Sequence, residues 1–141
     1  MKVLIAVDDS AESRHAVDVA YRFFGDADYS VLSVGNRPPV YVGGYGIGAI
    51  PTATDLTVQL DAAHAAAKEA ADDAASRLPG AAEIDVEDGR AGAVICEYAT
   101  EHGADVIVIG SHDRSFWERL FEPPVGRHVI EHAPCPVLVV R

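Results

Sequence analysis

The chain has 141 residues, which is enough for one ordinary domain with a single buried core. Hydrophobic residues make up 49% of it, which excludes a disordered chain, and the formal net charge is -11, from 22 acidic and 11 basic residues. A surface this negative repels phosphate backbones, so direct binding to nucleic acid is disfavoured.

No membrane or secretory segment is expected. The longest apolar runs, such as Val106–Ile109 and Val137–Val140, are far shorter than the roughly 20 residues that span a bilayer. The apolar run at the N-terminus is too short for a signal-peptide core. Cys96 and Cys135 form no Cys-x-x-Cys motif, so reduced thiols are expected. We therefore expect a cytoplasmic protein, either an ordinary acidic one or one adapted to high intracellular salt.

The first part of the chain predicts a strand, a helix and a second strand. The helix begins after Asp9, with Glu12 three residues later as a capping-box partner, and Gly25 ends it. Apolar residues at helical spacing predict its buried face, which is Val17, Ala20, Tyr21 and Phe24. The flanking strands are predicted at Lys2–Val7 and Tyr29–Val34.

A long loop and a long helix come next. The segment 35–55 has no periodicity and is rich in proline and glycine, which predicts a loop. Its Gly44-x-Gly46-x-Gly48 run lacks the Gly-Lys-Ser ending of a phosphate loop, so a flexible loop is the better interpretation. The helix that follows has a small-residue face, and Pro79-Gly80 ends it. The predicted face is Leu56, Leu60, Ala63, Ala67, Ala70, Ala74 and Leu78.

The remaining segments continue the alternation of strands and helices. We predict a half-exposed edge strand at 83–87, a helix at 91–102 and the most apolar, central strand at 104–109. A polar loop at 111–122, a short helix at 125–132 and a last strand at 137–140 follow. Alternating strands and helices with right-handed crossovers predict one doubly wound α/β domain over residues 1–141. In such a sheet the ligand crevice lies beyond the carboxyl ends of the strands.

Three stretches of this sequence resemble the universal stress protein family over the whole length of the chain. They are Val-Leu-Ile-Ala-Val-Asp-Asp-Ser at 3–10, Gly-Ala-Asp-Val-Ile-Val-Ile-Gly-Ser-His at 103–112 and His-Ala-Pro-Cys-Pro-Val-Leu-Val-Val at 132–140. The resemblance implies an adenine-nucleotide alpha-hydrolase-like fold: a five-stranded parallel sheet in the order 3-2-1-4-5, with helices on both faces and a crevice between the first and fourth strands. It also implies a homodimer joined through the last strand, Val137–Val140.

The same resemblance implies a nucleotide pocket that this sequence keeps only in part. Family members that bind ATP carry Gly-x-x-Gly, nine residues and then Gly-Ser or Gly-Thr after the fourth strand. Glycines and exposed amides there let the backbone approach phosphate. Here Asp113 stands at the second glycine and Pro123-Pro124 at the final pair. The pocket residues implied are Asp8 on the ribose and Val34 on the adenine, with Gly110, Ser111, His112 and Val125.

These departures weaken the phosphate half of the pocket. Proline has no backbone N–H, so two donors are lost, and Asp113 and Glu122 add negative charge. The loss amounts to several kcal/mol, roughly two to four decades of affinity. We therefore expect a non-catalytic dimeric regulator with no cofactor. The alternative is an ATP- or AMP-binding switch, and Asp8 can equally serve only to order the first helical turn.

Two other patterns in the sequence bear on function. His128, Glu131 and His132 match the inverted zinc-protease pattern, but the predicted helix is only about two turns long and Pro134 follows at once. No metal site and no nucleophile–base set are therefore expected. An apolar cluster in the polar loop marks either a protein-partner surface or a local satellite core: Phe116, Trp117, Leu120 and Phe121.

Overall fold

The computed structural model of the chain describes residues 1–36, 53–80, 82–111 and 125–141. Five parallel strands form one sheet in the order β3-β2-β1-β4-β5, which confirms the implied topology. The middle strand is β1, so the prediction that the fourth strand is central was one place off. The predicted strand bounds agree within two residues. The strands are β1 (Lys2–Val7), β2 (Asp28–Asn36), β3 (Glu83–Gly89), β4 (Val106–Gly110) and β5 (Val137–Val140).

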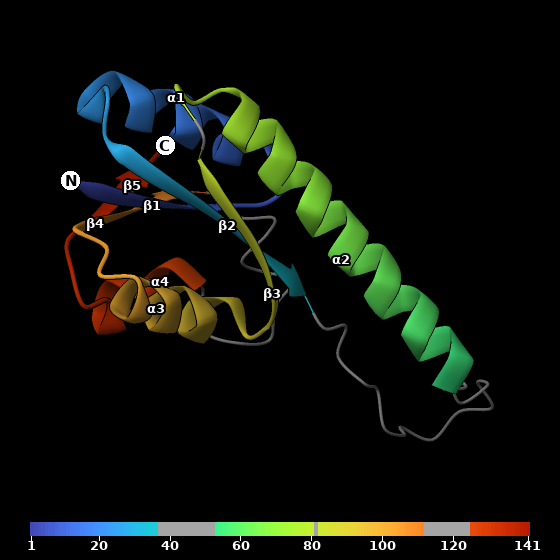
Figure 1. The fold of residues 1–141 in the computed structure, drawn as a ribbon. Helices are drawn as coiled ribbons and strands as arrows, with labels where there is room; N and C mark the ends of the chain where they lie inside the picture. Colours follow the sequence, from blue (N-terminus) through green and yellow to red (C-terminus); the bar gives the residue numbers. More distant parts are fainter. Residues whose placement is uncertain (37–52, 81, 112–124) are drawn as a thin grey trace.

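Helices cover both faces of the sheet, as Figure 1 shows. One face carries α1 and α2 and the other carries α3 and α4, and a separate hydrophobic cluster fills each side. Successive side chains of a strand point to opposite faces, so Ile5 faces the first cluster and Leu4 the second. The helices are α1 (Ala11–Phe24), α2 (Ala53–Ser76), α3 (Ala91–Glu101) and α4 (Val125–His132).

The start of α1 differs from the prediction by one residue. Its N-cap is Ser10 and not Asp9, because the Ser10 side chain accepts a hydrogen bond from the backbone N–H of Ser13. The predicted buried residue Tyr21 is 44% exposed. Val17 and Ala20 are buried as predicted, and Ser13, Ala16 and Val19 complete the buried face. The helix ends at Gly25 as predicted, at a φ of 56° that favours glycine.

The two halves of α2 have different surroundings. In the C-terminal half, the predicted small-residue face is buried at Ala67 and Ala74, and Leu78, which was predicted to belong to the helix, is buried just beyond its end at Ser76. In the N-terminal half Leu60, predicted to be buried, is 38% exposed, and Val58 is 62% exposed. The reason is length: 24 residues of helix span about 36 Å, whereas the seven residues of β3 span about 23 Å. The N-terminal half therefore extends beyond the sheet, as Figure 1 shows.

No described helix is both long and apolar enough to cross a membrane.

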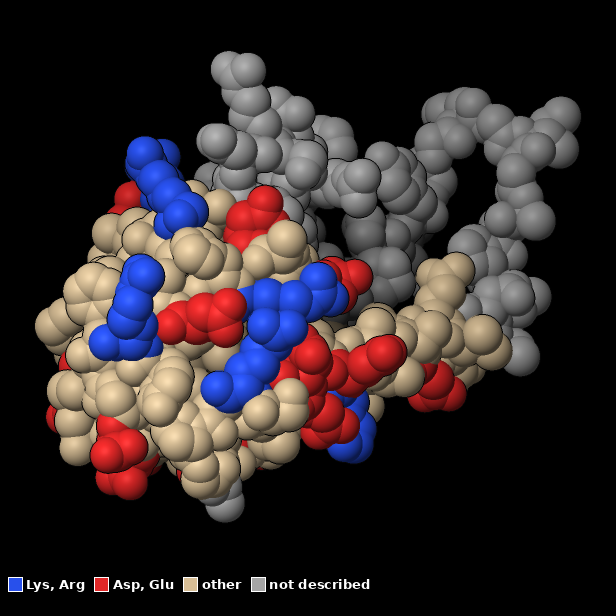
Figure 2. All heavy atoms as spheres, turned by 90° about the horizontal axis from the view of Figure 1, so that it is seen from above, with Lys and Arg blue, Asp and Glu red and all other residues tan. Residues whose placement is uncertain are grey.

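Charges of both signs are interleaved on the face that α1 and α2 form. Figure 2 shows basic side chains lying among acidic ones on this face, without a continuous basic patch. Arg14 of α1 lies 3.4 Å from Asp73 of α2, and Arg77 lies 3.3 Å from Asp73 and 3.7 Å from Asp18. The pairs Arg14–Asp73 and Arg77–Asp18 link α1 to α2 and the turn that follows it, whereas Arg77–Asp73 is a local pair between residues four positions apart.

Candidate functional site

A cavity of about 90 Å³ lies at the carboxyl ends of β1, β2 and β4. This is the place where the chain order reverses between β1 and β4, which is the expected ligand crevice of a doubly wound sheet. Its walls include Leu32, Ile95 and Ile109, and its polar lining includes the hydroxyl-bearing residues Ser10 and Ser13. An apolar crevice with a few polar groups at its rim is typical of a small-molecule site.

The structure brings four of the six predicted site residues together. Asp8 at the end of β1, Val34 in β2, Gly110 at the end of β4 and Val125 at the start of α4 all line the cavity. Ser111 follows Gly110 directly and is half-buried. His112 lies outside the described residues, as do Asp113 and the two prolines. The role of these residues in nucleotide binding stays a prediction.

The carboxylate of Asp8 is used by the turn that enters α1. Its Oδ1 accepts a hydrogen bond from the backbone N–H of Ser10 at 3.0 Å and another from the Ser10 hydroxyl at 2.5 Å. The amide of Asp8 donates to Oγ of Ser13 at 2.9 Å. Asp8 therefore orders the first turn, which is one of the two readings that the sequence left open. Among the described residues, none donates a hydrogen bond to its other oxygen, Oδ2.

Gly110 lets the start of α1 approach β4. A Cβ atom at this position would lie 2.8 Å from the carbonyl carbon and oxygen of Glu12 and 3.0 Å from the backbone nitrogen of Ser13. Real Cβ atoms hardly ever come that close to backbone. A packing requirement therefore explains this glycine without any ligand.

The backbone amide of Ser111 is also engaged within the protein. It donates to the carbonyl oxygen of Val140 at 2.6 Å, which continues the pairing of β4 with β5 by one residue. An amide that is already hydrogen bonded to a strand neighbour is a poor donor for a bound anion. The first amide after β4 is thus committed to the sheet.

The two free thiols are not activated. Burial raises the pKa of Cys96, and the nearby Cys135 and Glu97 raise it further. Burial also raises the pKa of Cys135, with a smaller contribution from Asp105. The thiolate is the nucleophilic form of cysteine, so both side chains have the chemistry of packing residues.

The inverted zinc-protease pattern does not assemble a metal centre within the described residues. The rings of His128 and His132 stack with centroids 4.2 Å apart, and Glu131 forms an ion pair with Arg127 at 2.8 Å. In the described part of the chain, no group of three ligand-type side chains includes either histidine. The apolar cluster Phe116, Trp117, Leu120 and Phe121 lies outside the described residues.

Ser10 and Ser13 line the cavity but were not among the pocket residues predicted from the sequence. Both belong to the first turn of α1, directly after the predicted aspartate. Hydroxyl side chains at the start of a helix that follows the first strand were a signal that could have identified them.

The sequence and the fold of this chain are similar to those of known proteins. A family model described as "Universal stress protein family" matches residues 1–141. The universal stress protein YxiE of Bacillus subtilis (strain 168) is 29% identical over 145 residues, covering 99% of this chain and 98% of the relative. The solved structure of universal stress protein UspA from Lactobacillus plantarum matches with a TM-score of 0.73 and 25% identity, covering 100% and 97% of the two chains. That of the universal stress protein from Archaeoglobus fulgidus in complex with dAMP matches with a TM-score of 0.60 and 23% identity, covering 100% and 98%.

Proposed function

We propose, from the premise that the chain belongs to the universal stress protein family, that it is a non-catalytic regulator of the stress response that does not bind ATP in the family's usual mode. It acts as a homodimer and through contacts with partner proteins. Its pocket retains the walls of a nucleoside site, whereas its phosphate loop has lost its donors.

The observation that carries this proposal is the hydrogen bond of the Ser111 amide. Because this amide donates to Val140, the first position after β4 offers no free N–H to a phosphate. The sequence removes further donors downstream, since Pro123 and Pro124 have no N–H and Asp113 carries a negative charge. A triphosphate has to be held by several donors, so it loses most of its binding energy at this site.

Restoring the loop tests this proposal. The variant with Asp113→Gly, Pro123→Gly and Pro124→Ser returns two amides and a hydroxyl to the phosphate half. In calorimetric titrations we expect the parent protein to show no micromolar ATP binding and the triple variant to gain at least about a hundredfold in affinity. Micromolar binding of ATP by the parent, with no gain in the variant, would show that the account of the loop is wrong.

A second candidate function is that of a nucleoside-monophosphate switch, and the composition of the cavity favours it. Leu32, Val34 and Ile109 form apolar walls that suit a base, and Oδ2 of Asp8 can accept a hydrogen bond from a ribose. A monophosphate needs fewer donors than a triphosphate, and the Archaeoglobus fulgidus relative was solved with dAMP. Titration of the parent with AMP separates the two candidates, because micromolar AMP binding without ATP binding favours the switch.

The homodimer is proposed to form through β5. This strand pairs with β4 on one side, and in the described part of the chain no strand pairs with its other side. Its residue Val139 is 38% exposed, and an uncovered apolar edge favours pairing with another strand. We expect light scattering at micromolar concentration to give the dimer mass for the parent and the monomer mass for Val139→Lys. A monomer mass for the parent would refute this interface.

A further inference from the structure

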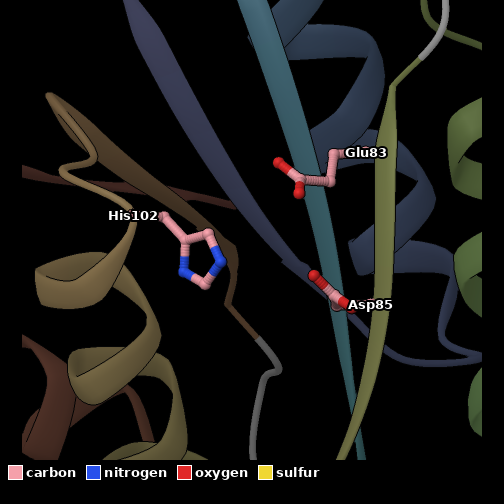
Figure 3. A group of neighbouring side chains, drawn as sticks. All are labelled: Glu83, Asp85 and His102. Carbon is pink, nitrogen blue, oxygen red and sulfur yellow. The ribbon is translucent and has the colours of Figure 1, made fainter.

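Three ligand-type side chains meet at the end of the sheet opposite the cavity. Glu83 and Asp85 lie two residues apart near the start of β3, so both point to the same face of the sheet. His102 directly follows α3, which packs on that face. Figure 3 shows the imidazole pointing toward the two carboxylates. One ligand atom of each residue lies within 4.8 Å of the others, so small side-chain movements would bring all three onto one ion.

The ring of His102 is oriented as a metal ligand would be. Its Nδ1 lies 3.1 Å from the backbone carbonyl oxygen of Tyr98. A carbonyl oxygen only accepts hydrogen bonds, so Nδ1 carries the proton in this contact and Nε2 of the neutral ring keeps its lone pair. In Figure 3, Nε2 is the ring nitrogen nearer to the carboxylates. Metal-binding histidines nearly always have their second nitrogen held in this way.

One buried residue positions two of the three side chains. The hydroxyl of Tyr98 donates to Oδ2 of Asp85 at 2.5 Å, and the Tyr98 ring stacks on the His102 ring with centroids 3.8 Å apart. Tyr98 is only 5% exposed, so it is a rigid support for both. The hydroxyl of Ser30 lies 3.5 Å from Oε2 of Glu83. Hydrogen bonds from surrounding residues to ligating groups are a regular feature of metal sites.

The two carboxylates have no basic counter-ion within the described residues. The ion pairs between lysine or arginine and acidic side chains in this part of the chain involve Asp18, Asp72, Asp73 and Glu131, and none of them involves Glu83 or Asp85. The ammonium group of Lys2 donates to the backbone oxygen of His102 and not to a carboxylate. A bound cation would offset the repulsion between the two negative charges.

We propose that Glu83, Asp85 and His102 bind a divalent transition-metal ion, with Zn²⁺ as the best match. One imidazole nitrogen with two carboxylate oxygens is a borderline ligand set that suits Zn²⁺ better than Mg²⁺ or Ca²⁺, which prefer oxygen alone. Three protein ligands leave at least one position for water. The ion links the edge strand β3 to the end of α3. Because the site lies away from the cavity, it does not depend on the function proposed above.

Calorimetric titration of the chelator-treated protein with ZnCl₂ tests this proposal. We expect one site with a micromolar Kd, no comparable binding of MgCl₂, and at least about a tenfold loss of Zn²⁺ affinity in His102→Gln and in Glu83→Gln. Glu83 is exposed, so its variant keeps the test valid if His102→Gln folds poorly. Tyr98→Phe removes only the hydroxyl that holds Asp85, and it should weaken binding about tenfold while the stacking remains.

His132→Gln is the matched control. Like His102, His132 stacks on an aromatic ring four residues earlier and has Nδ1 near that residue's carbonyl oxygen, at 2.9 Å. Among the residues that the structure describes, however, no pair of carboxylates groups with it. The His132→Gln variant should bind Zn²⁺ with the same affinity as the parent protein. A second readout is the ¹⁵N chemical shift of His102, because Zn²⁺ should move the resonance of Nε2. Failure of the parent to bind Zn²⁺ below millimolar concentration would overturn the proposal. So would Zn²⁺ binding that survives in His102→Gln and Glu83→Gln.

Discussion

The two ends of the sheet use polar side chains differently. At the cavity end, Asp8, Ser13 and the amide of Ser111 are all hydrogen bonded to groups of the protein itself. At the opposite end, Glu83 and Asp85 converge on His102, and the described residues supply no counter-ion. The polar groups at the cavity, where a doubly wound sheet usually binds its ligand, therefore stabilise the fold. The side chains that could bind a metal ion lie at the opposite end of the sheet, where this fold has no usual ligand site.

The largest expected effect is at Gly110, where the cavity end depends on close packing. Gly110→Ala puts a methyl group 2.8 Å from the backbone of Glu12, so the start of α1 has to move away from β4. We expect a loss of up to about 3 kcal/mol in the free energy of unfolding, measured by urea denaturation. A loss below about 0.5 kcal/mol would mean that α1 adjusts freely and that the glycine is not needed for packing.

A smaller loss is expected when Ser13 loses its hydroxyl. Ser13 is 5% exposed and its Oγ accepts the hydrogen bond of the Asp8 amide, so Ser13→Ala leaves a partly buried donor without its partner. The expected cost is about 1–2 kcal/mol in the free energy of unfolding. Ser76→Ala is the control, because the Ser76 hydroxyl is exposed and donates to a backbone oxygen of the same helix, that of Asp73. Equal effects of the two substitutions would contradict a structural role for the polar groups of the cavity.

The smallest effect on stability is expected at the other end of the sheet. In the metal-free protein, Glu83→Gln removes one of two neighbouring negative charges, and the hydrogen bond that its carboxylate accepts within the described residues is a long one from Ser30, at 3.5 Å. Urea denaturation should give a change within about 0.5 kcal/mol, or a slight gain. A loss greater than about 1 kcal/mol would show that this carboxylate supports the fold, and the contrast between the two ends would disappear.

The sequence predicted the elements well because their signals are local. Apolar runs and helical spacing located the five strands and four helices of the described residues, and Gly25 marks the end of α1 as expected. The predicted burial of some side chains was wrong: Tyr21 and Leu60 have the helical spacing of core residues, but both are exposed. Periodicity shows which residues share a helix face, but it does not show how far that face is covered by the sheet.

The candidate site was predictable only in part. Asp8, Val34, Gly110 and Val125 were placed through family resemblance, and the structure does bring them around one cavity. Nothing local revealed that the Ser111 amide is bonded to Val140, because that contact joins the ends of two strands 29 positions apart, as their numbers show. The contact between Asp85 and Tyr98 was equally invisible, since it depends on how α3 lies across β3.

By itself, the sequence determined the alternation of strands and helices, the family and the presence of Asp113, Pro123 and Pro124, since each of these depends on residue type and spacing along the chain. Only the tertiary structure decided which polar groups are already bonded and which are left to meet a ligand. Hydrogen bonds and charge pairs act over a few ångströms in space, and the packing of helices on the sheet sets those distances.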